Sequence, residues 1–151
     1  MREDQFLDVT VTHTVPKIND DPRRTIVTMA LEPGLKLPFD AVVEFNDIYF
    51  KSKGEVVGNH RHKWWEIFQV KPRPDVERVQ SEPVLWLVWV SHSGSTRYQD
   101  IYVGDIIVVK PGIFHAFKVM GDPRYFFLGV LMDQAFYRSG VTSCDPPLIK
   151  G

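Results

Sequence analysis

Short runs of apolar and β-branched residues recur along the chain, and each run is bounded by Gly, Pro, Asn or Asp. β-Branched and aromatic residues favour strands, whereas the boundary residues favour turns. The pattern therefore predicts about eight strands, with the ranges 24–31, 41–52, 60–70, 84–91, 96–103, 106–110, 113–120 and 124–132. Many short strands joined by short connections are typical of an all-β sandwich or barrel.

Helical patterning is confined to the segment 133–140, which ends at a glycine and is long enough for about two turns. Neither internal repeats nor low-complexity segments interrupt the series of strands. We therefore predict one domain over residues 1–151, with an N-terminal arm at about 1–22 and a C-terminal tail at about 133–151. Such an arm often covers the edge of a neighbouring sheet, so we expect a homodimer.

Length and charge narrow the classes of partner. A chain of 151 residues with 18 basic and 19 acidic side chains has a balanced surface, which favours neither nucleic acid nor an anionic membrane as a partner. No apolar run approaches the ~20 residues that a membrane-spanning helix needs. Cys144 is the single cysteine, so no internal disulfide is possible and a cytoplasmic location is expected. A small-molecule substrate is the partner that these observations leave.

Candidate functional side chains are most concentrated in residues 58–68, which read GNHRHKWWEIF. In a helix, residues two apart point in different directions, whereas in a strand every second side chain shares a face. The all-β setting favours a strand, which would place five side chains on one face, namely His60, His62, Trp64, Glu66 and Phe68.

A third histidine, His115, follows the Pro111-Gly112 turn in a later strand, and a barrel interior can bring it to the same place. Three imidazoles and a carboxylate suit one divalent ion, Fe, Mn, Ni or Zn, with positions left for water or substrate. The alternative is a hydrogen-bonded polar cluster without a metal. Because buried ionisable groups without a cation carry a heavy desolvation cost, we predict that His60, His62, Glu66 and His115 bind a metal.

Other side chains are candidates for contacts with a substrate. His60 and His62 are also candidate catalytic residues, and Tyr49 is a candidate for proton transfer if it points inward with Phe45. Aromatic packing is the alternative for Tyr49. The candidates for substrate binding are Trp64, Phe68, Tyr102 and Phe117. His13 and His92 are expected at the surface.

Two segments resemble the motifs of the cupin superfamily. Residues 54–66, GEVVGNHRHKWWE, are similar to the first cupin motif, with Gly54 and the predicted ligands at 60, 62 and 66 at its positions. Residues 104–115, GDIIVVKPGIFH, are similar to the second motif at Gly104, Gly112 and His115. The resemblance spans roughly residues 41–132 and implies a double-stranded β-helix, the jelly roll of cupins.

This resemblance leaves the reaction open, because one fold can carry many activities. The string VVGNHRHKWWE resembles small cupins that act on nucleotide-linked keto sugars, and residues 48–50, IYF, resemble their aromatic strand. That likeness implies an isomerase or epimerase that acts on a sugar or a nucleotide sugar, a small polar metabolite. A non-haem iron dioxygenase and a non-catalytic cupin that binds a small molecule are the alternatives.

Overall fold

The computed structural model describes residues 7–30, 37–40, 42–73, 79–133 and 141–150. Within these ranges all regular secondary structure is β, and no helix is long and apolar enough to cross a membrane. The strands are β1 Val9–Thr12, β2 Lys17–Asp21, β3 Arg24–Thr28, β4 Glu44–Ile48, β5 Val56–Arg61, β6 Glu66–Pro72, β7 Leu85–Val90, β8 Thr96–Ile101, β9 Ile106–Val109, β10 His115–Val119, β11 Phe126–Met132 and β12 Thr142–Ser143.

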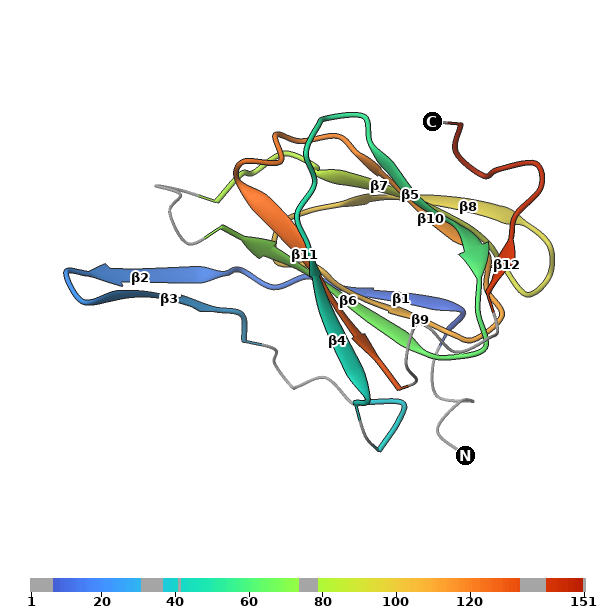
Figure 1. Cartoon of the computed structure of the whole chain (residues 1–151), viewed down its shortest axis with the longest axis horizontal. Helices are drawn as coiled ribbons and strands as arrows, with labels where there is room; N and C mark the ends of the chain where they lie inside the picture. Colours follow the sequence, from blue (N-terminus) through green and yellow to red (C-terminus); the bar gives the residue numbers. More distant parts are fainter. Residues whose placement is uncertain (1–6, 31–36, 41, 74–78, 134–140, 151) are drawn as a thin grey trace.

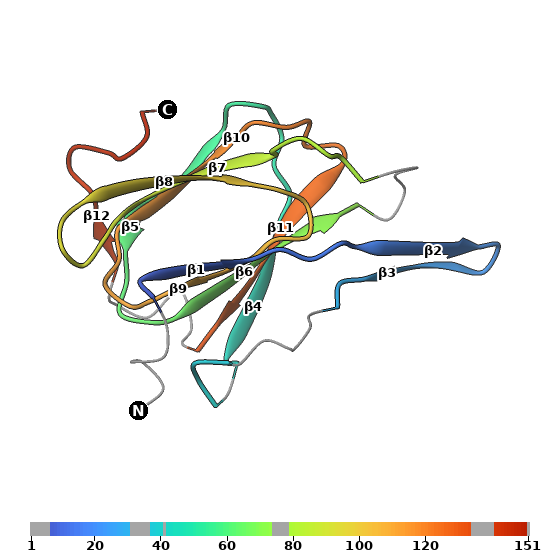
Figure 2. The same cartoon turned by 180° about the vertical axis from the view of Figure 1, so that it is seen from behind.

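Ten of these strands form two sheets that face each other (Figures 1 and 2). The first sheet has the order β1-β9-β6-β11-β4, and the second has the order β12-β5-β10-β7-β8. Neighbouring strands are antiparallel, and most consecutive strands, such as β5 and β6, lie in different sheets, whereas β7 and β8 pair within the second sheet. This is the jelly-roll arrangement, so the predicted all-β fold is confirmed.

The main core fills the space between the sheets. Phe68 of β6 meets Phe117 of β10 with their ring centroids 4.9 Å apart, and both side chains are buried. Leu128 of β11 and Leu87 of β7 belong to the same cluster and have no solvent exposure. Apolar side chains from both sheets therefore hold the two layers together through the hydrophobic effect.

Several strands are buried on both faces. Ile67 of β6 and Val108 of β9 point to the outer side of the first sheet, where Phe39 and Trp65 pack with them. Ile149, from the C-terminal tail, packs against Val88 and Ala116 on the outer side of the second sheet. These outer layers explain why β9 reads as a continuous apolar run rather than as an alternating one.

The predicted strand 60–70 is wrong as a single element. The structure has two strands, β5 ending at Arg61 and β6 beginning at Glu66, and they belong to different sheets. Residues 62–65 form the connection that crosses between the sheets. Period-two alternation therefore does not explain the convergence of the histidines with Glu66, which comes from the crossing of the chain.

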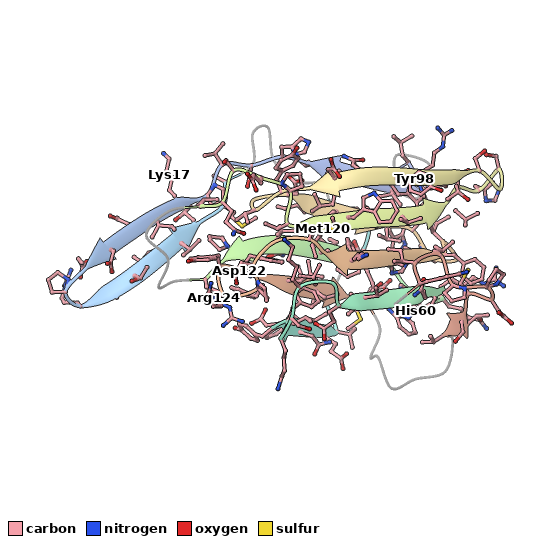
Figure 3. All side chains as sticks on the ribbon, turned by 90° about the horizontal axis from the view of Figure 1, so that it is seen from above. Lys17, His60, Tyr98, Met120, Asp122 and Arg124 are labelled. Carbon is pink, nitrogen blue, oxygen red and sulfur yellow. The ribbon has the colours of Figure 1, made fainter. Side chains whose placement is uncertain are left out.

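The N-terminal arm contains strands that the sequence pattern did not predict. Its strand β1 pairs with β9 of the same chain, with Val9 opposite Val109. Strands β2 and β3 then form a hairpin that pairs with no other described strand and extends beyond the two sheets (Figures 1 and 3). The side chain of Asp21 shapes its turn by accepting hydrogen bonds from the backbone N–H groups of Arg23 and Arg24, at 2.7 and 3.2 Å.

The C-terminal tail contains a short strand as well. Strand β12 pairs with β5, with Ser143 opposite His60. The predicted helix at 133–140 lies outside the described residues except for Asp133, whose carboxylate accepts a hydrogen bond from the backbone of Trp65 at 3.1 Å. Thus the part of the tail that the structure describes packs against the strand that carries the first histidine of the candidate site.

Candidate metal centre

Four side chains from separate elements converge between the sheets. His60 lies near the end of β5, His62 in the crossing segment, Glu66 at the start of β6 and His115 at the start of β10. One ligand atom from each residue lies within 4.8 Å of all the others. Only His60 is partly exposed, because His62, Glu66 and His115 have exposed fractions of 2%, 5% and 1%. The structure therefore brings together all four residues that the sequence predicts as metal ligands.

A close approach of two backbones positions the histidine pair. His115 is the register partner of His60 in the β5–β10 ladder, and the register shifts between His115 and Ala116. Gly58 has φ +93°, and a Cβ atom at this position would lie 2.8 Å from the backbone oxygen of His115. Glycine is required here because any larger residue would strain the backbone and push β10 away.

The C-terminal tail holds the residue before His60. Asn59 has φ 57°, in the left-handed region that asparagine tolerates better than most residues. Its side-chain amide donates to the backbone oxygen of Ile149 at 2.9 Å and accepts from the Ile149 N–H at 3.0 Å. The Cys144 N–H also donates to the backbone oxygen of Asn59 at 2.7 Å. These bonds fix the irregular backbone from which the His60 side chain projects.

Backbone carbonyls set the tautomers of the two buried histidines. Nδ1 of His62 lies 3.1 Å from the oxygen of Trp64, and Nδ1 of His115 lies 2.9 Å from the oxygen of Ile113. A carbonyl oxygen can only accept a hydrogen bond, so each Nδ1 carries the proton. In the neutral ring each Nε2 is then an unprotonated acceptor, the form in which histidine binds metals.

Both Nε2 atoms face the same carboxylate oxygen. Oε1 of Glu66 is in close contact with Nε2 of His62 and lies 3.2 Å from Nε2 of His115. An ionised carboxylate and two neutral imidazole nitrogens are all acceptors, so they cannot satisfy one another. A cation must lie among them, either extra protons on the rings or a metal ion. A divalent ion satisfies all these acceptors at once.

The electrostatics favour the forms of Glu66 and His60 that bind metals. Burial would raise the pKa of Glu66, but hydrogen bonds and charge interactions with His115 and His62, when these rings carry an extra proton, outweigh burial and lower the pKa to about 2. Burial lowers the pKa of His60 to about 4; positive charge on His115 or His62 adds to this effect, and the charge of Glu66 opposes it. At neutral pH, Glu66 is therefore ionised and His60 is neutral.

Trp64 supports the site from behind. Its ring stacks on His62 with the centroids 4.5 Å apart and an interplanar angle of 5°, and its side chain is completely buried. The expectation that Trp64 contacts a substrate is not supported, because it does not line the cavity that reaches the cluster. The ring belongs to the core because residues 62–65 turn inward between the sheets.

A cavity of about 300 Å³ leads to the four-residue cluster. Phe68 and Phe117, two of the predicted substrate-binding residues, line it, and so do Glu66, His60 and His115. Most of the remaining wall is aliphatic and comprises Ile48, Val57, Leu128, Val130 and Met132. The cluster thus lies in a largely apolar cavity between the sheets.

The two predicted tyrosines lie elsewhere. Tyr49 is 53% exposed and stacks on Phe127 at 4.9 Å, and Phe45 is 74% exposed. The inward orientation that a role of Tyr49 in proton transfer needs is not found, because the inward positions on this side are Asn46 and Ile48, which line the cavity; the stack on Phe127 agrees with the alternative of aromatic packing.

Tyr102 follows the end of β8, where Ile101 pairs with Leu85, whereas His115 pairs with Trp89 near the other end of β7. Tyr102 therefore lies toward the opposite end of the barrel from the cluster. His13 is beside it, 63% exposed at its side chain, with its Nδ1 2.5 Å from the buried carboxylate of Asp105. His13 and His92 are both exposed, as predicted.

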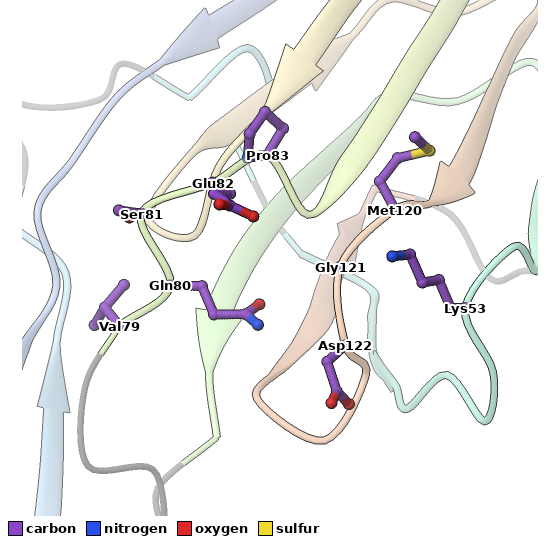
Figure 4. Close-up of a pocket in the computed structure, with 9 residues that line it drawn as sticks. All are labelled: Lys53, Val79, Gln80, Ser81, Glu82, Pro83, Met120, Gly121 and Asp122. Atoms are coloured by element: carbon purple, nitrogen blue, oxygen red, sulfur yellow. The ribbon is translucent and has the colours of Figure 1, made fainter.

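A second, more polar cleft of about 540 Å³ contains none of the predicted site residues. Figure 4 shows Gln80 and Glu82 on one side of this cleft and Lys53 and Asp122 on the other. The cleft lies between the connections that join β4 to β5, β6 to β7 and β10 to β11. None of the four candidate ligands lies in these connections or lines the cleft, so the cleft is separate from the metal-ligand cluster.

Sequence reasoning missed several contributors to the site. Asn59 fixes the backbone before His60, and the carbonyls of Trp64 and Ile113 orient the two buried rings. The Gly-Asn pair before the histidine was a signal for an unusual backbone, since both residues favour positive φ. No sequence pattern marks a backbone carbonyl as the partner of a particular ring.

Comparisons with solved structures reveal the same fold in enzymes that act on nucleotide-linked sugars. A mutant 3,4-ketoisomerase from Thermoanaerobacterium thermosaccharolyticum, in complex with TDP-4-keto-6-deoxyglucose, is 11% identical and aligns over 93% of this chain and 94% of its own, with a TM-score of 0.60. A TDP-fucose-3,4-ketoisomerase from Campylobacter jejuni is 10% identical over 93% of this chain and 96% of its own, with a TM-score of 0.59.

A dTDP-4-dehydrorhamnose 3,5-epimerase from Bacillus anthracis, with TDP and PPi bound, is 15% identical and aligns over 90% of this chain and 78% of its own, with a TM-score of 0.60. Neither a protein-family model nor a curated protein sequence matches the chain. At these identities the likeness establishes the fold alone, so the jelly roll implied by the two sequence motifs is confirmed.

Proposed function

We propose that this chain is a metal-dependent enzyme of the isomerase or epimerase type that acts on a small carbonyl compound. The metal site would consist of Nε2 of His62 and His115, a carboxylate oxygen of Glu66 and an imidazole nitrogen of His60. The observation that carries this proposal is the contact of both buried Nε2 atoms with Glu66 Oε1, since acceptors that face one another require a cation.

Three nitrogens and one oxygen fit Fe, Mn, Ni or Zn as the resident ion. When bound, such an ion supplies Lewis-acid polarisation of a carbonyl oxygen. The protein provides the orientation of the ligands, through the backbone carbonyls that hold the Nδ1–H groups of His62 and His115. Phe68 and Phe117 provide an apolar wall that displaces water from a bound carbonyl group.

The likeness to ketoisomerases and epimerases supports a reaction that moves a proton next to a carbonyl. Of the predicted catalytic residues, His60 lines the cavity, whereas His62 is behind the cluster and Tyr49 is outside it. This arrangement favours a second candidate function. A metal-free isomerase would use His60 as its general base, because His60 is the partly exposed imidazole that lines the cavity.

The dioxygenase and the non-catalytic binding protein remain the alternatives from the sequence, because the same ligand set suits iron. One experiment separates the candidates. The purified protein is dialysed against each of the four ions, its metal content is measured, and candidate carbonyl compounds are incubated with it in D₂O and in an oxygen electrode.

Isomerisation with a metal predicts about one ion per chain, deuterium exchange next to the carbonyl and no oxygen uptake. Exchange without a bound ion would favour His60 as the base, and oxygen uptake with iron would favour the dioxygenase. Tight binding without either reaction would favour the binding protein. Glu66→Gln tests the site, and His92→Gln is the matched control because His92 is exposed and outside the cluster.

The homodimer remains a prediction, but the expected contact is now the hairpin of β2 and β3 rather than the start of the N-terminal arm. Strand β1 covers an edge of its own sheet, so the hairpin of β2 and β3 is the part of the arm that is free to reach another chain. A two-stranded hairpin is marginally stable by itself in water, and Ile26 on it is 49% exposed. We expect a second copy of the chain to cover this hairpin. We also expect the protein to be located in the cytoplasm.

A further inference from the structure

We infer that the cavity binds a small uncharged molecule with an apolar body and a polar head, rather than a nucleotide-linked sugar. This inference rests on the proposed function, since the head is expected to reach the metal ligands. It departs from the substrates named for the enzymes of similar fold, and three features of the cavity support it.

The first feature is the separation of polar and apolar walls. His60, Glu66 and His115 are contiguous in the cluster, so the polar atoms that could receive a head group lie together. The body of the ligand would contact aliphatic and aromatic side chains from both sheets, such as Phe117 and Val130. Asn46 also lines the cavity, and its side-chain amide donates a hydrogen bond to the carboxylate of Glu44 at 3.2 Å. Such a wall stabilises apolar groups in proportion to the area removed from water.

The second feature is the charge of the lining. Among the described residues that line the cavity, Glu66 is the charged side chain and neither lysine nor arginine is present. A diphosphate is normally held by arginine, lysine or the N-terminus of a helix. Arg61 follows His60 in sequence, but it is exposed and its guanidinium lies over the ring of Phe114 at 4.7 Å, outside the lining. A bound diphosphate would therefore lose water without gaining a cationic partner from this wall.

The third feature is the size of the cavity. A volume of about 300 Å³ is at the lower end of the range of roughly 300–1,000 Å³ found for small-molecule sites. The walls are part of the packed core, with Leu128 of the first sheet at 0% and Phe117 of the second sheet at 1% exposure, so the cavity cannot widen without disturbing both sheets. A compact metabolite fits this space, whereas a nucleotide would have to remain outside it.

Two hydroxamates of equal length test this inference directly. Hexanohydroxamic acid has two oxygen donors and an uncharged aliphatic body, whereas adipic acid monohydroxamate has the same head and a terminal carboxylate. Isothermal titration calorimetry of each compound, and of TDP, is carried out with the zinc-loaded full-length protein. We expect the uncharged compound to bind at least about tenfold more tightly than the charged one, because the carboxylate would be buried without a partner, and we expect TDP not to compete with it.

The same comparison with metal-free protein separates this inference from the proposed function. Hexanamide and adipic acid monoamide differ by the same terminal carboxylate, but their amide groups can bind to the protein without a metal ion. If the protein fails to bind zinc, the metal proposal is wrong, yet a preference for hexanamide still supports an uncharged apolar body. Equal or tighter binding of the charged member of either pair, or displacement by TDP, would overturn the inference, as would the failure of both uncharged compounds to bind.

A variant pair locates the binding. Val130→Phe places a ring in the cavity from β11, whereas Leu131→Phe adds the same ring on the opposite face of that strand. We expect Val130→Phe to weaken hexanohydroxamate binding at least about tenfold, and Leu131→Phe to leave it unchanged. Thermal unfolding and zinc content verify that both variants are folded. If Val130→Phe fails to fold, Phe117→Leu serves in its place, because this substitution enlarges the cavity. We expect Phe117→Leu to bind the uncharged compound more tightly than the charged one. Loss of this preference would contradict the inference.

Discussion

His60 and His115 are register partners across the β5–β10 ladder, with their ring centroids 5.2 Å apart. Each belongs to a different sequence motif, so this single pairing joins the two motifs at one site. His62 and Glu66 complete the site because the chain crosses between the sheets immediately after β5. The geometry of the site is therefore a direct consequence of the jelly-roll topology.

Removal of His115 is expected to abolish stable metal binding. Loss of an outer hydrogen bond to a metal ligand costs roughly 10–100-fold in affinity, so loss of a ligand should cost more than this. Metal content after dialysis against zinc, measured for His115→Ala and for the exposed control His92→Ala, checks this prediction. Equal zinc content in both variants would show that His115 is not a ligand.

Trp64→Leu is expected to weaken metal binding without removing a ligand. The substitution removes the ring that stacks on His62, and it leaves a void that costs about 2–4 kcal/mol of unfolding free energy. With His62 less well oriented, zinc affinity should fall roughly tenfold. Trp64→Phe, which keeps an aromatic face, should lose less affinity in a competition assay with a fluorescent chelator. The same affinity in both variants would argue that the stack does not orient His62.

The metal-free protein is expected to lose stability as the pH falls from about 6.5 to about 4. The pKa of His60 is about 4 in the folded protein against 6.5 as its ordinary value, so the unfolded chain binds the proton first in this interval. Glu66 acts at lower pH, because its pKa falls from 4.5 to about 2 and its contribution is lost between these values.

Thermal unfolding at a series of pH values checks this prediction. His60→Gln should flatten the dependence between pH 6.5 and 4, whereas the exposed control His92→Gln should retain it. If His60→Gln keeps the full slope, His60 is not the group responsible for the loss.

Asn59 is expected to stabilise the end of β5 through two separable effects. Asn59→Ala removes both hydrogen bonds to Ile149 and places alanine at φ 57°, so the unfolding free energy should fall by about 2–4 kcal/mol. Asn59→Gly loses the same bonds but tolerates this backbone, so its loss should be about 1 kcal/mol smaller. Chemical denaturation measures both values. Equal losses would mean that the left-handed backbone carries no cost in Asn59→Ala.

Self-association is expected to depend on the hairpin of β2 and β3. Ile26→Asp introduces a charge at an exposed apolar position of the hairpin and should convert a dimer into a monomer. Tyr98→Asp is a matched control on the exposed edge strand β8 and should remain dimeric. Analytical ultracentrifugation checks both variants. A wild-type monomer at high concentration would contradict the prediction.

The β content and the four candidate ligands could be predicted from the sequence, because turn residues delimit the strands and the two motifs contain unusual ligand spacings. The crossing at residues 62–65 could not be predicted, since Trp64 and Trp65 fit an apolar strand pattern as well as an inward connection. The orientation of the Tyr49 side chain could not be predicted for a related reason. Parity fixes which residues share a face, but the topology decides which face is inside.

We expect three imidazoles and one carboxylate to hold a divalent ion between the sheets. X-ray absorption spectroscopy of the zinc-loaded protein measures the number and type of ligand atoms directly. We expect about one ion per chain, a first shell of nitrogen and oxygen at roughly 2.0–2.2 Å, and the outer-shell scattering of imidazole rings, reduced in His115→Ala. A protein that retains no stoichiometric zinc after loading, or a spectrum without imidazole scattering, would contradict the account.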